Sequence, residues 1–205
     1  MIPKLQDGVS RGESFSSGQR WRFSRVFPRK VRQGAKVKSY TVLNKVTPGA
    51  TKKESASEVI SGDAYARFDE PTKTWTIGTS MVEEKVRFAN VVFALISFEN
   101  KLARRQYVSE PNRSEEIRAS INGKTYTGAS RGWIWKGGEA GVLSQGEIQL
   151  VVTLENDLLQ VQKAYVVYPA TSIIRQWVTY LNRSASAITI SDPYSLSLRL
   201  RLDET

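Results

Sequence analysis

The segment from Ala164 to Asn182 limits the possible folds more than any other part of the chain. Four residues that favour β-structure stand in succession at Tyr165–Tyr168, and Pro169 then interrupts the segment because proline has no N–H to donate to a strand ladder. Large side chains alternate from Ser172 to Leu181, so both faces of this second strand carry them. A hairpin of this kind is not stable alone in water, so we expect other strands to cover it.

The remaining sequence repeats the period of two residues. Strand-like segments are separated by turn signals, of which Asn122-Gly123 is the strongest, since it tolerates the positive φ of a type I′ hairpin turn. Val91–Phe98 is a short, nearly continuous apolar run, typical of a strand buried on both faces. The helical period is almost absent, and one helical turn is expected within Glu99–Val108. The chain is therefore predicted to be all-β, an antiparallel two-sheet β-sandwich.

Within the segment Met81–Phe88, one charge breaks the alternating pattern. Val82 and Val86 share a face of the predicted strand, and Glu84 lies on this apolar face as well. Glu83 points to the opposite face. The two neighbouring carboxylates therefore cannot act on one substrate atom.

Charge divides the chain into two parts. Met1–Lys53 contains 13 Lys/Arg and two acidic residues, whereas the remainder contains 17 Lys/Arg and 18 acidic residues. We predict a basic, flexible N-terminal segment over residues 1–57 and the β-sandwich domain over 58–205. The last apolar alternation runs to the C-terminus without a turn, so the domain is expected to continue beyond Thr205. Basic residues interleaved with aromatic ones could contact an anionic polymer or lipid surface; they are Arg20, Arg22, Arg25, Arg29, Lys30 and Arg32.

Composition excludes several kinds of chemistry. The chain has no histidine and no cysteine, which removes the commonest general base, disulfides and the usual zinc ligands. Carboxylates remain for acid–base work, and Asp63, Asp69 and Glu70 flank one strand segment, although carboxylates beside turns are usually solvated. No apolar stretch has the length of a transmembrane helix and no signal peptide is evident, so the sequence assigns no compartment. No cofactor and no metal site is predicted.

Two parts of the sequence resemble the N-terminal β-supersandwich domain of glycoside hydrolase family 36, the α-galactosidase family. The first part comprises Thr74–Glu84 and Leu95–Leu102, and the second comprises Val166–Val178 and Leu181–Ile190. The resemblance extends over residues 58–202 in the order of that family, and it implies a supersandwich-like fold. The family is implied to carry its catalytic aspartates in a (β/α)₈ barrel after the sandwich. Nothing in this chain corresponds to that barrel, so no catalytic residue is transferred.

The candidate carbohydrate-binding residues are Arg131, Trp133, Trp135 and Lys136. Two tryptophans two positions apart in an extended segment place their rings on one face, which Arg131 shares. Aromatic rings stack on the apolar faces of sugars, and basic side chains hydrogen-bond to hydroxyl groups. The same rings could instead fill the space between two sheets, so both interpretations stay open. The glycine-rich segment Gly137–Gly141 favours an accessible edge.

These observations predict a non-catalytic accessory β-sandwich of a carbohydrate-active, α-galactosidase-like protein. Such a domain would pack on a catalytic glycosidase domain or bind carbohydrate, and it is not expected to be an enzyme by itself. The alternative function is binding of nucleic acid or an anionic surface through the basic, aromatic N-terminal segment. Trp75, Trp177 and Tyr168 are expected in the core because they lie inside alternating strands.

Overall fold

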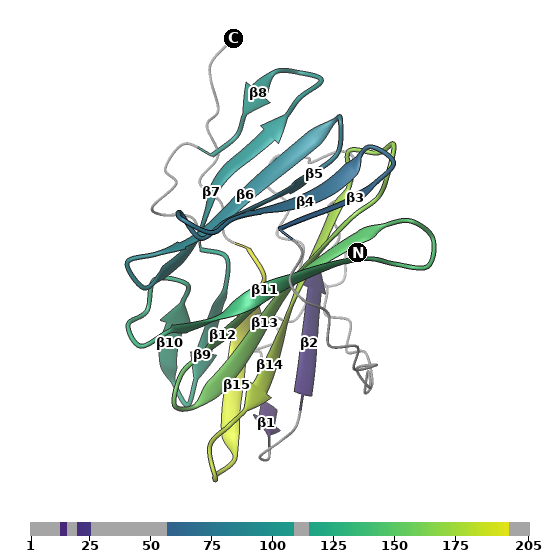
Figure 1. Ribbon diagram of the computed structural model, residues 1–205. Helices are drawn as coiled ribbons and strands as arrows, with labels where there is room; N and C mark the ends of the chain where they lie inside the picture. Colours follow the sequence, from purple (N-terminus) through teal and green to yellow (C-terminus); the bar gives the residue numbers. More distant parts are fainter. Residues whose placement is uncertain (1–12, 16–19, 26–56, 109–114, 197–205) are drawn as a thin grey trace, which may run out of the picture.

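The structure is a computed structural model that describes residues 13–15, 20–25, 57–108 and 115–196 (Figure 1). Every regular element in these ranges is a β-strand. The strands are β1 (Glu13–Phe15), β2 (Arg20–Arg25), β3 (Glu58–Ser61), β4 (Ala64–Asp69), β5 (Thr74–Gly78), β6 (Val82–Ala89), β7 (Val92–Asn100), β8 (Arg105–Gln106), β9 (Arg118–Ile121), β10 (Lys124–Thr127), β11 (Ile134–Val142), β12 (Ile148–Glu155), β13 (Leu159–Val167), β14 (Ile174–Asn182) and β15 (Ile188–Tyr194). The described residues thus contain no helix that is long and apolar enough to cross a membrane.

In the described residues the strands form three antiparallel sheets. Sheet A has the order β1-β15-β9-β10, sheet B the order β11-β12-β13-β14-β2, and sheet C the order β3-β4-β5-β6-β7-β8. The predicted fold class, an antiparallel all-β sandwich, is confirmed.

Sheet B forms one layer of the sandwich, and sheets A and C share the other. Tyr180 on β14 donates a hydrogen bond to the carbonyl oxygen of Arg118 on β9 in sheet A. Gln176 points from the same face of β14 and donates to Glu84 on β6 in sheet C. Both sheets therefore pack on one face of sheet B (Figure 1). The shared apolar core includes Trp75, Ile77, Leu95, Ile121, Leu150, Tyr165, Val178 and Ile190.

The central hairpin is formed by β13 and β14, as predicted. Tyr165 pairs with Gln176, and the chain reverses at Ala170, whose φ is 57°. The predicted Asn122-Gly123 turn is also confirmed. Asn122 has a φ of 49° and Gly123 a φ of 79°, and together they join β9 to β10.

The helical turn expected within Glu99–Val108 is wrong. The chain continues in β7 to Asn100, reverses, and pairs back as β8. The Asn100 side chain accepts a hydrogen bond from the N–H of Ala103 (3.0 Å), and Arg104 has a φ of 49°. Asparagine favours this local turn, and a left-handed residue does not continue a helix, so a hairpin forms instead.

The expected core residues belong to two separate apolar clusters. Trp75 is fully buried in the shared core. Trp177 on β14 and Tyr168, which follows β13, belong to a separate small apolar cluster with Ala164, Val166 and Val151. The opposite face of sheet B, rather than the shared core, thus contains these two aromatic residues.

Two stretches of the basic N-terminal segment are strands of the sandwich. β1 pairs with β15, which places Glu13 opposite Ile190, and β2 pairs with β14, which places Arg22 opposite Thr179. The predicted boundary at residue 57 therefore leaves two strands of the fold, β1 and β2, within the N-terminal segment. Residues 26–56 and 197–205 lie outside the described residues, and of the last apolar alternation (Leu196, Leu198, Leu200 and Leu202) only Leu196 is described.

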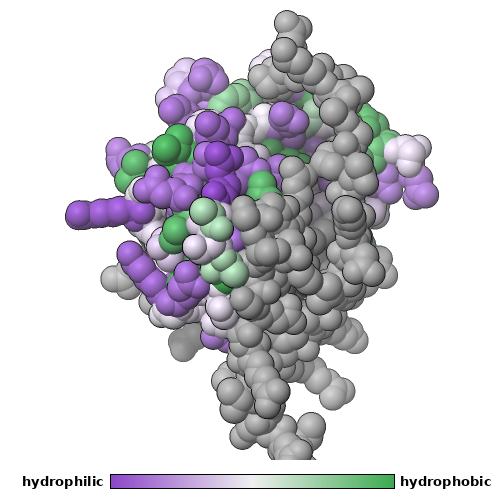
Figure 2. Space-filling model, turned by 90° about the horizontal axis from the view of Figure 1, so that it is seen from below, coloured by the Kyte–Doolittle hydropathy of each residue, from purple (hydrophilic) through white to green (hydrophobic). Residues whose placement is uncertain are grey.

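Apolar side chains on the surface are dispersed. On the face shown in Figure 2, hydrophilic and hydrophobic residues intermingle over the described part. The large exposed hydrophobic residues come from several strands and turns, and only Val142 and Leu143 are consecutive; the set is Ile60, Val91, Leu102, Ile134, Val142, Leu143, Ile173 and Tyr194. Isolated apolar residues are ordinary on a protein surface and do not identify a site.

Candidate functional site

A β-bulge in β11 shapes a hollow on the surface. The register of β11 against β12 shifts between Trp135 and Gly137, so Lys136 is an extra residue on the bulged strand. Gly137 has a φ of 111°, a conformation that side chains disfavour. At Gly138, a Cβ atom would lie 2.3 Å from the Nε1 atom of Trp75. One glycine therefore permits the backbone bend, and the next permits close packing on a core indole.

We call the space beside this bulge the Trp135 hollow. Its volume is about 340 Å³, and its lining residues are Phe68, Glu70, Trp135, Lys136, Gly137, Gly138, Glu139, Val151 and Thr153. The first two belong to β4 and the turn after it, in sheet C. The others belong to β11 and β12, in sheet B. The hollow thus extends across the edge where sheets B and C meet.

The Trp135 ring is held in place by aromatic packing. It stacks on Phe88 with ring centroids 5.5 Å apart, and it lies nearly parallel to Phe68 with centroids 6.3 Å apart. Phe68 stacks in turn on Trp75 at 4.8 Å. A ring that is already ordered loses little conformational entropy when a ligand binds beside it.

Polar groups of both charges surround the hollow. Glu70, Lys136 and Glu139 are exposed, and Thr153 is half-buried. Carboxylates accept hydrogen bonds, an ammonium group donates them, and a hydroxyl group does both. The hollow therefore combines an aromatic ring with hydrogen-bonding groups of opposite kinds.

Two of the four predicted carbohydrate-binding residues do not line this hollow. Trp133 is only 3% exposed, packs in the core, and donates a hydrogen bond from Nε1 to the carbonyl oxygen of Thr127 (2.8 Å). The core interpretation therefore holds for this residue. Arg131 is exposed in the turn before β11, and the φ of 93° at Gly132 separates it from the extended strand.

The other two predicted residues, Trp135 and Lys136, do line the hollow. The structure adds Glu70 and Glu139 to them, although Glu70 is distant in sequence. The sequence suggested Glu70 only as a carboxylate beside a turn. Its place in the hollow depends on the packing of β4 against β11.

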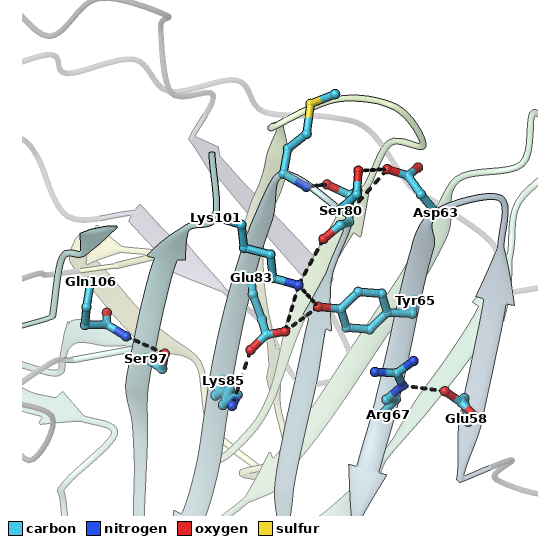
Figure 3. Close-up of polar contacts among 12 residues, drawn as sticks. Glu58, Asp63, Tyr65, Arg67, Ser80, Glu83, Lys85, Ser97, Lys101 and Gln106 are labelled. Atoms are coloured by element: carbon cyan, nitrogen blue, oxygen red, sulfur yellow. Dashed lines mark hydrogen bonds and ion pairs between the residues drawn. The ribbon is translucent and has the colours of Figure 1, made fainter. Parts of the chain in front are cut away.

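The outer face of sheet C carries a polar network across neighbouring strands (Figure 3). Lys101 donates to the hydroxyl oxygen of Tyr65 (2.6 Å) and pairs with Glu83 (3.1 Å), which also accepts from Tyr65 and pairs with Lys85 (3.3 Å). Burial alone would raise the pKa of Glu83, but hydrogen bonds from Tyr65 and Lys101 outweigh this effect and lower it. Glu83 is therefore an ionised link between strands rather than a proton acceptor poised near neutral pH.

The acidic residues that flank β4 have different partners. Asp63 accepts a hydrogen bond from the Ser80 hydroxyl (2.6 Å; Figure 3). It also accepts one from the N–H of Ala170 (2.6 Å), and both bonds lower its pKa. Asp69 accepts from the hydroxyl of Thr72. Asp63 thus joins two turns, Asp69 stabilises its own turn, and Glu70 lines the hollow.

A second set of polar residues is enclosed where the three sheets meet. We call Glu84, Glu116, Lys163, Tyr165 and Gln176 the buried cluster; each is at most 1% exposed. Lys163 Nζ lies 3.2 Å from Glu116 Oε2 and 2.8 Å from Gln176 Oε1, and it also donates to the carbonyl oxygens of Glu116 and Ser195. Tyr165 donates to Glu116 Oε2 (2.5 Å), and Gln176 Nε2 lies 2.7 Å from both Glu84 carboxyl oxygens.

The sequence contains part of the signal for the buried cluster. Glu84 lies on the apolar face of its strand, as the alternation indicated, and Glu83 lies on the other face. Lys163 likewise stands between Val161 and Tyr165 on the buried face of β13. Glu116 precedes β9 and has no periodic signal, so its membership depends on tertiary packing.

The N-terminal candidates for anionic contact are only partly described. Arg20, Arg22 and Arg25 belong to β2, whereas Arg29, Lys30 and Arg32 lie outside the described residues. Within the described ranges, no group of three or more acidic residues could hold a metal ion.

Comparisons with family models, curated proteins and solved structures give no match to this chain. The resemblance to the supersandwich of glycoside hydrolase family 36 therefore stays a prediction based on the sequence.

Proposed function

We propose that this chain is a non-catalytic β-sandwich module that binds carbohydrate in the Trp135 hollow. The observation that carries the proposal is a fixed indole beside a hollow of about 340 Å³ whose surroundings include Glu70, Lys136 and Glu139. Ligand sites begin at about 300 Å³, so the volume suits one small unit rather than a large ligand. A polyhydroxylated ligand can both donate and accept, which matches carboxylates and an ammonium group together.

The absence of histidine and cysteine from the whole sequence supports a binding role. The family resemblance also implies an accessory domain without its own catalytic aspartates. A non-catalytic module needs only shape, stacking and hydrogen bonds, and an indole with hydrogen-bonding groups around a hollow is compatible with that need. Packing on a catalytic glycosidase domain is the other role that the family resemblance implies.

Isothermal titration calorimetry on the full chain tests this proposal with a panel of α-galactosides, β-glucans, chito-oligosaccharides and pectic fragments. We expect millimolar or tighter binding of at least one class. Lys136→Ala removes a charged hydrogen-bond donor, which should raise the dissociation constant about tenfold or more. Because Lys136 is exposed, the melting temperature of the Lys136→Ala variant should equal that of the unaltered chain.

Lys124→Ala is the matched control, since Lys124 is an exposed lysine on β10 outside the hollow. It should bind like the unaltered chain. Trp135→Phe keeps an aromatic ring against Phe88 and should weaken binding less than Lys136→Ala weakens it. No binding to any sugar, or equal weakening by both lysine variants, would contradict the proposal.

The anionic-surface alternative makes a different prediction in the same titrations. Binding to duplex DNA or heparin through β2 and the neighbouring basic residues should weaken steeply as salt concentration rises. Binding of a neutral sugar should depend little on salt.

A further inference from the structure

The buried cluster holds two carboxyl groups and one amino group, and their contacts are unequal. Lys163 contacts Glu116 and has four oxygen atoms around Nζ, all of them acceptors, which favours the charged ammonium form. Burial lowers the pKa of Lys163, and the carboxylate of Glu116 opposes this effect. Glu116 also accepts from Tyr165, so it is the carboxylate that the cation stabilises.

The second carboxyl group of the cluster, that of Glu84, has no cation of the described residues within ion-pair distance. Its oxygens meet only the amide Nε2 of Gln176, and the other end of that amide meets Lys163. An ionised Glu84 would leave the enclosed cluster with one negative charge in excess. An unpaired buried charge costs several kcal/mol, and a group in this position takes up a proton instead.

We propose that Glu84 is a neutral carboxylic acid in the folded chain and acts as a proton-dependent latch that holds sheet C on sheet B. Glu84 is the contribution of sheet C to the buried cluster, and Gln176 is the residue of sheet B that it contacts. With the proton bound, the charges in the cluster balance. When the proton is lost, the excess charge favours separation of β6 from β14 so that water can reach the carboxylate.

The groups that face Glu84 come from each element packed against it. β13 supplies Lys163 and Tyr165, β14 supplies Gln176, and the segment before β9 supplies Glu116. Burial raises the pKa of Tyr165, so its hydroxyl stays protonated over the range considered. The other inward residues of β5 and β6 near this point are apolar, so they offer no compensating charge.

The direction of the effect agrees with the titration of Glu84. Burial, and next the charge of Glu116, raise its pKa from 4.5 to about 8. A raised folded-state pKa means that the folded chain binds the proton more tightly than the unfolded chain. The stability from this proton is fully present below about pH 4.5 and is lost progressively as pH rises toward about 8.

The latch also bears on the Trp135 hollow, and this consequence rests on the proposed function. Phe68 and Glu70 line the hollow from sheet C, whereas Trp135 and Thr153 line it from sheet B. Separation of the two sheets would pull these walls apart. Carbohydrate binding should then weaken at alkaline pH in parallel with loosening of β6.

The test compares the full chain with Glu84→Gln, which is neutral at every pH and nearly the same shape. Urea unfolding is followed from about pH 5.5 to 7.5, where one proton changes the folding constant by up to about tenfold per pH unit. We expect the ratio of the folding constants of Glu84→Gln and the unaltered chain to rise roughly a hundredfold over this range. Hydrogen exchange of the β6 amides, measured at about pH 9 for both proteins, should be faster in the unaltered chain.

Glu83→Gln is the matched control on the neighbouring residue. The pKa of Glu83 is lowered from its ordinary value of 4.5, so its ionised form stabilises the fold above that pH. Glu83→Gln should therefore lower stability by a nearly constant amount across the tested range, and it should keep the alkaline loss. A constant ratio between Glu84→Gln and the unaltered chain, or equal exchange of β6 in both, would overturn the latch. These readouts need no sugar, so the latch can fail or succeed independently of the binding function.

Discussion

Replacing Lys163 by methionine is the sharpest test of how the three sheets are joined. Methionine fills much of the same volume but removes the ammonium group that lies 3.2 Å from Glu116 Oε2. Lys163 and Glu116 are 1% and 0% exposed, so solvent cannot replace the lost partner. Glu116 Oε1 already has no hydrogen-bond partner among the described residues, which leaves Tyr165 as its main support.

The expected cost follows from the burial of the remaining charge. Removal of one member of a buried ion pair typically destabilises a protein by about 3–5 kcal/mol. Single domains have unfolding free energies of about 5–15 kcal/mol, so Lys163→Met should remove a large part of the stability. Most of this cost is the uncompensated Glu116 charge rather than lost attraction.

The double variant Lys163→Met, Glu116→Gln separates these two contributions. It removes both charges, so it should recover at least about 2 kcal/mol relative to Lys163→Met alone. Urea unfolding of the full chain at about pH 7, followed by tryptophan fluorescence, measures both variants. The reasoning is refuted if Lys163→Met lies within about 1 kcal/mol of the unaltered chain, or if the double variant is no more stable than the single one.

Two further substitutions test packing near the hollow. Gly138→Ala should destabilise the chain by about 1–3 kcal/mol, because the new Cβ would lie 2.3 Å from Nε1 of the buried Trp75 ring. Gly141→Ala is the control, since the space around its Cβ is open. Equal melting temperatures of the two variants would argue against the close contact. Trp133→Phe should cost about 1 kcal/mol in chemical denaturation, since it removes the 2.8 Å hydrogen bond to Thr127, and an unchanged midpoint would show that this bond adds nothing.

The candidate site was only partly predictable from the sequence. Trp135 and Lys136 were identified by an aromatic residue and a basic residue next to glycines. The same spacing groups Trp133 with them, because residues two apart share a face of a strand, yet Trp133 is buried in the core and Trp135 packs only partly against it. Glu70 could not be assigned to the hollow, because no local pattern states which strand edges become neighbours.

Alternation and turn chemistry in the sequence determined the strands, the Asn122-Gly123 turn and the central hairpin, since these depend on neighbouring residues and on backbone preferences. Alternation also showed that Glu84 is an acid on an apolar face. Only the tertiary structure decided that sheets A and C share one layer, that β1 and β2 join the sheets, and that Glu84, Glu116 and Lys163 meet. The physical reason is that hydrogen bonds between strands and contacts between enclosed charges depend on residues brought together by folding, whereas the side-chain period depends only on local order along the chain.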